Sequence, residues 1–189
     1  MDALLPTFLA ALLAEFGDKT QLLAIVLALR FPRREGAVLA GIAVAALANS
    51  LIAAGAGQLI HQMINFRAIT LMIAVALLSA GVGSLMRQRR PDTADSWKLG
   101  AFGTSAVSFG ILAFGDTTQF LTMTLAARAD SLLLAAAGAT AGTVAGAAVA
   151  VALADRFEKS LPLRPLRHGI AGLFLLIGFV TAIGALRLI

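Results

Sequence analysis

The sequence contains no cysteine, and only 13% of its 189 residues are charged. The missing cysteine excludes disulfides, thiolate metal sites and cysteine nucleophiles. A soluble domain usually carries about 25% charged residues, so the low value argues against a soluble globular protein. Hydrophobic residues make up 59% of the chain, and the mean hydropathy is +0.91. These properties place the chain among membrane proteins.

Long apolar runs predict an all-α membrane protein, because a lipid-exposed backbone must satisfy its own hydrogen bonds. A helix needs about 20 residues to cross a bilayer. Asp2 and the absence of a basic segment ahead of the first run predict a retained helix rather than a cleaved signal peptide. The predicted transmembrane helices are six: 3–29, 36–60, 68–86, 100–127, 131–154 and 169–187.

The net charge of +5 does not indicate nucleic-acid binding, because the basic residues sit in short loops and form no nucleic-acid motif. Eleven of the fifteen lie in or beside three alternate loops: Arg30, Arg33, Arg34, Arg87, Arg89, Arg90, Lys98, Arg156, Lys159, Arg164 and Arg167. The opposite side has only Arg67, Arg128 and Arg187. Cytoplasmic loops carry the excess of basic residues. We therefore expect a multi-pass protein of the inner (plasma) membrane with both termini on the non-cytoplasmic side.

The two halves of the chain resemble each other. EFGDKTQ at 15–21 aligns with AFGDTTQ at 113–119, and Gly41, Ala45 and Asn49 fall opposite Gly138, Gly142 and Gly146. Three spans in each half mean that the second copy enters the membrane from the opposite side, which is an inverted repeat. We expect a first repeat at 1–90, a cytoplasmic linker at 91–98 and a second repeat at 99–189. The ladder of Gly138, Gly142 and Gly146 predicts close helix packing. For Asn49, a packing role is favoured over lining a transport pathway.

Charged residues interrupt the first apolar run. On a continuous helix, Glu15, Asp18 and Lys19 share one face because they are three and four residues apart. Each charge at the bilayer centre costs about 2.5–3.5 kcal/mol on insertion scales, so the group must face the bundle interior or a cavity. Asp116 has the same constraint in the second half. Two such motifs meeting near the membrane midplane predict a binding site at the repeat interface.

The motifs offer only oxygen ligands for a cation. The predicted metal ligands are Glu15, Asp18 and Asp116, and the auxiliary residues are Lys19, Thr20, Gln21, Asn49, Thr117, Thr118 and Gln119. Oxygen-only sites favour Mn²⁺, Ca²⁺ or Mg²⁺ over Zn²⁺ or Cu⁺. Three carboxylates and one lysine leave a charge that one divalent cation neutralises. Carboxylates also bind protons, which gives one site the chemistry for exchanging metal against protons.

These motifs resemble those of the Gdt-type cation transporters, also called uncharacterised protein family sixteen. The family pattern Glu-x-Gly-Asp-Lys/Arg-Thr/Ser occurs once in each three-helix half, and EFGDKT at 15–20 matches it fully. The resemblance implies export of Mn²⁺ or Ca²⁺, in exchange for protons, with Glu15, Asp18 and Asp116 as cation ligands. It identifies the chain as similar to the bacterial manganese exporters. The second motif is degenerate, with Ala113 in place of Glu and Thr117 in place of Lys or Arg.

Two other functions remain open on sequence grounds: export of another small cationic solute, and a non-transporting membrane scaffold held together by the ion pairs. An enzyme is not expected, since no nucleophile–base pair or cofactor motif is present. We expect no cofactor apart from the transported divalent cation, and as partners membrane lipid, the cation and protons but no nucleic acid. The sequence leaves the oligomeric state open.

The basic asymmetry predicts the side on which the chain ends. A reporter that is active only in the cytoplasm should be silent when fused after Ile189 and active when inserted in the loop at 87–98, because that loop carries an excess of basic residues. Reporter activity in intact cells measures both. Activity of the fusion after Ile189 would reverse the predicted orientation.

Overall fold

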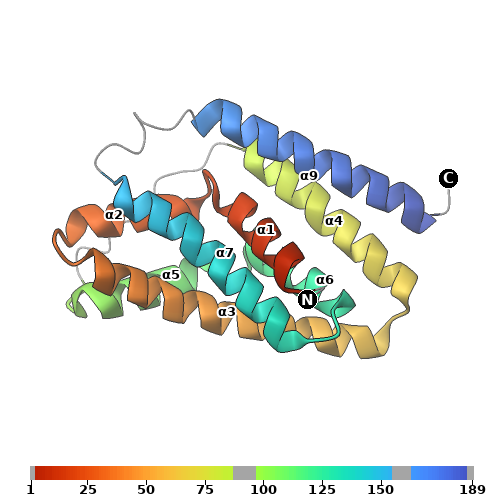
Figure 1. Cartoon of the computed structure of the whole chain (residues 1–189), viewed down its shortest axis with the longest axis horizontal. Helices are drawn as coiled ribbons and strands as arrows, with labels where there is room; N and C mark the ends of the chain where they lie inside the picture. The colour runs from red at the N-terminus through yellow and green to blue at the C-terminus, as the bar shows by residue number, and fades with distance from the viewer. Residues whose placement is uncertain (1–2, 87–96, 155–162, 187–189) are drawn as a thin grey trace.

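The computed structural model describes residues 3–86, 97–154 and 163–186. These residues form eight helices, labelled as in Figure 1: α1 (Leu4–Glu15), α2 (Lys19–Arg30), α3 (Glu35–Met63), α4 (Phe66–Leu85), α5 (Gly100–Ala113), α6 (Thr117–Arg128), α7 (Leu132–Ala152) and α9 (Leu163–Leu186). Within this part of the chain, four helices are long and apolar enough to span a membrane: α3, α4, α7 and Pro165–Leu186 of α9. The all-helical prediction is confirmed for these residues.

The first and fourth predicted spans are not continuous helices. The span at 3–29 is divided into α1 and α2, and the span at 100–127 into α5 and α6. The prediction that Glu15, Asp18 and Lys19 share one helix face is therefore wrong, because the helix ends at Glu15 and a new one begins at Lys19. The other four segments are helices close to their predicted bounds.

Each break follows from the three residues Phe-Gly-Asp. Phe16 is extended, Gly17 has a φ of +78°, and Asp18 is extended and caps the next helix by accepting a hydrogen bond from the Thr20 amide at 3.4 Å. Gly115 has the matching φ of +73°. Glycine enters this left-handed region without steric cost, and aspartate is a favoured N-cap. The motif is thus a helix stop followed by a helix start.

Two glutamines satisfy the backbone at the breaks. The Gly17 amide donates to Gln21 Oε1 at 2.8 Å, and the Gly115 amide donates to Gln119 Oε1 at 2.5 Å. Each side chain also reaches a crossing helix. Gln21 Nε2 donates to the Gly146 carbonyl of α7 at 3.3 Å, and Gln119 Nε2 donates to the Asn49 carbonyl of α3 at 3.5 Å. The breaks are therefore fixed in position against α7 and α3.

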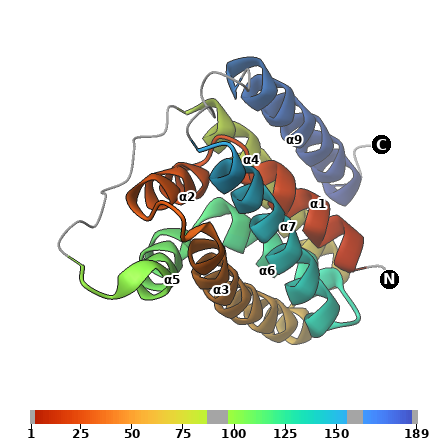
Figure 2. The ribbon, with the colours of Figure 1, turned by 60° about the vertical axis from the view of Figure 1, so that its left-hand side comes forward.

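The helices of the first half pack mainly on those of the second. α1 lies along α7, α3 along α5, and α4 along α9, as the two views in Figures 1 and 2 show. A Cβ atom at Gly138 or Gly142 would collide with the α1 backbone, and one at Gly41 would collide with the α5 backbone. The predicted packing role of the ladder is confirmed, because these helices approach too closely for any larger side chain.

The predicted linker at 91–98 lies mostly outside the described residues, which resume at Trp97. There the Arg30 guanidinium, at the end of α2, donates to the Trp97 carbonyl at 3.1 Å. This contact joins the basic end of the first broken helix to the segment that leads into α5.

The two motif glycines should respond differently to the same substitution. A left-handed φ costs a non-glycine residue about 1–2 kcal/mol at either site. A Cβ at Gly17 would also collide with the Arg167 side chain, whereas at Gly115 nothing lies within 4 Å. Gly17→Ala should therefore lower the melting temperature of the detergent-solubilised protein more than Gly115→Ala.

The matched control is Gly17→Ala in an Arg167→Ala background, which removes the obstacle. There the penalty of Gly17→Ala should fall to that of Gly115→Ala. Equal penalties for the two glycines in the wild-type background would contradict the packing of Arg167 over Gly17.

Candidate cation site

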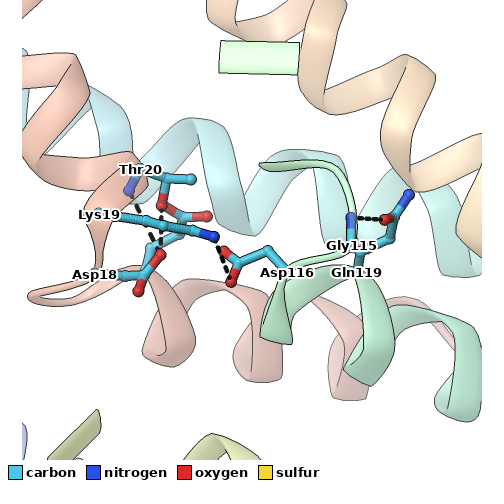
Figure 3. Close-up of polar contacts among 7 residues, drawn as sticks. Asp18, Lys19, Thr20, Gly115, Asp116 and Gln119 are labelled. Atoms are coloured by element: carbon cyan, nitrogen blue, oxygen red, sulfur yellow. Dashed lines mark hydrogen bonds and ion pairs between the residues drawn. The ribbon is translucent and has the colours of Figure 1, made fainter. Parts of the chain in front are cut away.

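The two motif aspartates lie together where the broken helices meet. Asp18 begins α2 and Asp116 begins α6, so each carboxylate sits at the N-terminus of a half-helix. Both side chains line the same cavity, and Figure 3 shows the Lys19 side chain extending from the first motif to Asp116. Residues almost one hundred positions apart thus form one acidic pair, as expected for two motifs meeting at a common site.

Lys19 pairs with the aspartate of the other half. Its Nζ lies 3.4 Å from Asp116 Oδ1, and the Asp116 side chain is only 9% exposed. Among the described residues, Asp116 Oδ2 has no hydrogen-bond partner. A buried carboxylate oxygen without a partner is uncommon and unfavourable. Lys19 therefore satisfies one oxygen of the Asp116 carboxylate, and the other oxygen remains for a further ligand.

Glu15 is joined to this pair through a hydroxyl. It is fully buried at the end of α1, and Thr20 Oγ1 lies 2.7 Å from Glu15 Oε2 and 3.1 Å from Asp18 Oδ2. Because a hydroxyl has one hydrogen, it can donate to only one of the two carboxylates at a time. Thr20 therefore links Glu15 to Asp18, and the two carboxylates share its one hydrogen.

The motif residues line two small cavities. The aspartate cavity, of about 90 Å³, is lined by Asp18, Lys19, Asp116, Thr117 and Arg167 among others. The glutamate cavity, of about 20 Å³, has among its lining residues Glu15, Asn49, Ala113, Thr118, Gln119 and Thr143. A cavity holds one water when about 10–15 Å³ is accessible. The first cavity thus has room for several waters or a hydrated ion, and the second for about one.

The predicted ligands do not all gather around one point. Within the described ranges, no three acidic, histidine or cysteine residues are grouped closely enough to hold an ion together. Asp18 and Asp116 line one cavity, while Glu15 is linked to Asp18 through Thr20 and lines the other cavity. The role of the three carboxylates as ligands stays a prediction.

The auxiliary residues divide between structure and cavity. Gln21 and Gln119 fix the helix breaks, and Gln119 also lines the glutamate cavity. Thr117 lines the aspartate cavity and Thr118 the glutamate cavity. Asn49 Nδ2 donates to the Gly110 carbonyl of α5 at 3.2 Å, so the expected hydrogen bond across helices is present, and its side chain also lines the glutamate cavity.

The sequence patterns did not predict Arg167 or Thr143 as residues of the site. Arg167 of α9 packs over Gly17 and donates from Nε to the Ser84 carbonyl at 3.1 Å and from its terminal nitrogen to the Met86 carbonyl. It thereby ties α9 to the end of α4 beside the aspartates. Thr143 of α7, one turn before Gly146, lines the glutamate cavity together with Glu15. The ladder could have pointed to Thr143, but no local pattern pairs Arg167 with α4.

Comparison with known proteins agrees with this arrangement. The family model described as "Divalent cation/proton antiporter GDT1" matches residues 3–92 and 101–188. The chain belongs to this family. A protein of Vibrio cholerae serotype O1 described as "Putative manganese exporter" is 31% identical over 183 residues, which cover 96% of this chain and 91% of that protein. No solved structure matches the chain.

Membership in the GDT1 family agrees with an acidic pair placed between apolar helices. The family is one of membrane transporters, and the long apolar helices of this chain fit a multi-pass membrane protein. The chain is therefore a member of a cation-transporting family. Each of its two segments that match the family model contains one Gly-Asp break.

Arg167 should control access to the aspartate cavity. Each hydrogen bond contributes about 0.5–1.5 kcal/mol, so losing two should raise the open fraction roughly tenfold. Because the chain has no cysteine, Thr117→Cys introduces a single thiol in that cavity. Arg167→Gln should raise its rate of modification by a water-soluble thiol reagent about tenfold.

A thiol at Met63→Cys serves as the control, since Met63 is 81% exposed at the end of α3. Its modification rate should not respond to Arg167→Gln. An unchanged rate at Thr117→Cys would show that Arg167 does not close the cavity.

Proposed function

We propose that the chain exports a divalent cation, Mn²⁺ in the first place and Ca²⁺ as the alternative, in exchange for protons. The observation that carries the proposal is the Asp18–Asp116 pair, which two separate motifs bring to one cavity and in which the buried Asp116 keeps a carboxylate oxygen without a partner among the described residues. Oxygen donors of this kind suit Mn²⁺ and Ca²⁺. The relative described as a manganese exporter supports the choice of Mn²⁺.

The proposed architecture is an inverted repeat of two three-helix halves, at 1–90 and 99–189 with 91–98 between them. Three observations support it. The glycine breaks and the glutamine caps each occur once per half in matching positions. In both halves, glycines also lie against the backbone of a helix from the other half. Secondary transporters built in this way bind their substrate near the membrane midplane, at broken helices. With the basic loops in the cytoplasm, both termini lie outside the inner membrane.

Charge balance supports the proposed exchange. Glu15, Asp18 and Asp116 with Lys19 carry a net charge of −2 when all are ionised, and one divalent cation neutralises it. A buried site with that charge and no cation is unfavourable, so protons are taken up when the cation leaves. Thr20 couples the two ends of the site, since its hydroxyl can satisfy either Glu15 or Asp18. Cation and proton occupancy therefore exclude each other.

Lys19 serves as the internal counter-charge of the site. In the arrangement described, its ammonium lies against Asp116. A cation can reach the unpartnered Oδ2 of Asp116 first, and it must displace this ammonium to take Oδ1 as well. The flexible side chain of lysine allows such a displacement without movement of the helices.

Substitution of Glu15 tests this function directly. In Glu15→Gln the amide oxygen still accepts from Thr20, so the fold is kept, but the side chain no longer exchanges a proton. We expect Mn²⁺ uptake into reconstituted vesicles with an imposed pH gradient to fall to the level of protein-free vesicles. Asp18→Asn and Asp116→Asn should have the same effect, since each leaves the site one charge short.

Glu35→Gln is the matched control, because Glu35 is an exposed glutamate at the start of α3. It should transport like the wild type. Normal Mn²⁺ transport by Glu15→Gln between pH 6 and 8 would refute the site. Uptake of an organic cation but of neither metal would favour the other solute, and loss of stability without any wild-type flux would favour a scaffold.

A further inference from the structure

The side chains at one matched pair of positions differ in size between the two halves. At the end of α1, Glu15 lies against Gly146 of α7, where an added Cβ would be 2.9 Å from Glu15 Cβ. The corresponding end of α5 is Ala113. The residue of α3 that corresponds to Gly146 is Asn49, because Gln119 donates to its carbonyl as Gln21 donates to that of Gly146. A large side chain thus faces glycine in one half, and alanine faces a larger side chain in the other.

The orientation of the Asn49 amide is fixed by its partner. The Gly110 carbonyl only accepts hydrogen bonds, so the amide nitrogen must face α5, as the 3.2 Å contact indicates. Oδ1 is then the polar atom that remains for the glutamate cavity. Ala113, Thr118 and Glu15 line the same cavity. The volume beside Ala113 is therefore shared by a neutral amide and a hydroxyl, opposite a single carboxylate.

We propose that Asn49 occupies the space that a glutamate at position 113 would need, and that its amide oxygen is a neutral ligand in place of that second carboxylate. This inference rests on the proposed function and specifies the ligands of its site. It explains why the second motif ends α5 with alanine while the glutamate cavity stays small. It also leaves Glu15 as the carboxylate that lines the glutamate cavity, so that one divalent cation suffices for neutrality.

The first experiment tests the shared volume without requiring transport. Ala113→Gln adds the size of a glutamate without its charge and should lower the melting temperature by several degrees, because the cavity of about 20 Å³ cannot hold both amides. Asn49→Gly should lower it as well, through the lost hydrogen bond. The double variant Asn49→Gly/Ala113→Gln should melt within a few degrees of the wild type, well above the sum of the single effects.

Leu47→Gly provides the control for this cycle, because Leu47 is on the exposed side of the same helix, 44% exposed. Leu47→Gly combined with Ala113→Gln should show additive losses. Additive losses for Asn49→Gly with Ala113→Gln would overturn the shared volume, whatever the protein transports.

The second experiment tests the ligand. Asn49→Gly/Ala113→Gln moves an amide oxygen to the opposite wall of the cavity, whereas Asn49→Gly/Ala113→Met restores a similar volume without the oxygen. In Mn²⁺ uptake assays, we expect the glutamine double variant to keep a KM near the wild-type value and the methionine double variant to raise KM about tenfold.

Equal KM values for the two double variants would overturn the ligand role of Asn49. Glu15→Gln, measured in the same vesicles, distinguishes this failure from that of the proposed function. If Glu15→Gln transports normally, the whole site is wrong. If it is inactive while the two double variants have equal KM values, only the role of Asn49 is wrong.

Discussion

A helix that breaks inside a membrane protein leaves backbone N–H and C=O groups without their usual partners, and the hydrocarbon of the bilayer offers none in their place. The side chains of Gln21 and Gln119 resolve this constraint, each accepting from the glycine amide four residues before it. Each glutamine also donates to a carbonyl of a helix that crosses the break. The position of both aspartates, at the start of the second half-helices, follows from these four hydrogen bonds.

The same breaks explain why small residues dominate the contacts between the halves. A glutamine amide reaches a carbonyl on the neighbouring helix only if the two backbones approach closely, and Gly41, Gly138 and Gly142 permit that approach. α3 and α7 therefore act as rigid supports for α5 and α1. Gln21 and Gln119 are bonded to backbone groups at both ends of their amides, whereas Lys19 contacts Asp116 through a long, flexible side chain.

The sequence predicts much of this arrangement but misses its local geometry. Apolar runs locate the long helices, and the repeated Gly-Asp motif predicts that Asp18 and Asp116 meet. The helix period suggested a shared face for Glu15, Asp18 and Lys19, and it failed because Gly17 followed by an N-cap aspartate ends one helix and starts another. The contact of Lys19 with Asp116 and of Arg167 with α4 depends on tertiary packing, which no local pattern encodes.

The ion pair between Lys19 and Asp116 joins residues of different halves. For the proposed transport, this means that a site without cargo is not an empty site, since it carries its own tethered cation as a resident competitor. An incoming metal ion gains only the difference between its own attraction to the carboxylates and that of the ammonium. In this proposal, the ammonium keeps the affinity of the site for the metal ion moderate. The return of the Lys19 ammonium to Asp116 assists release of the ion. In the proposed cycle, the ion leaves without exposing a bare pair of carboxylates to the apolar interior.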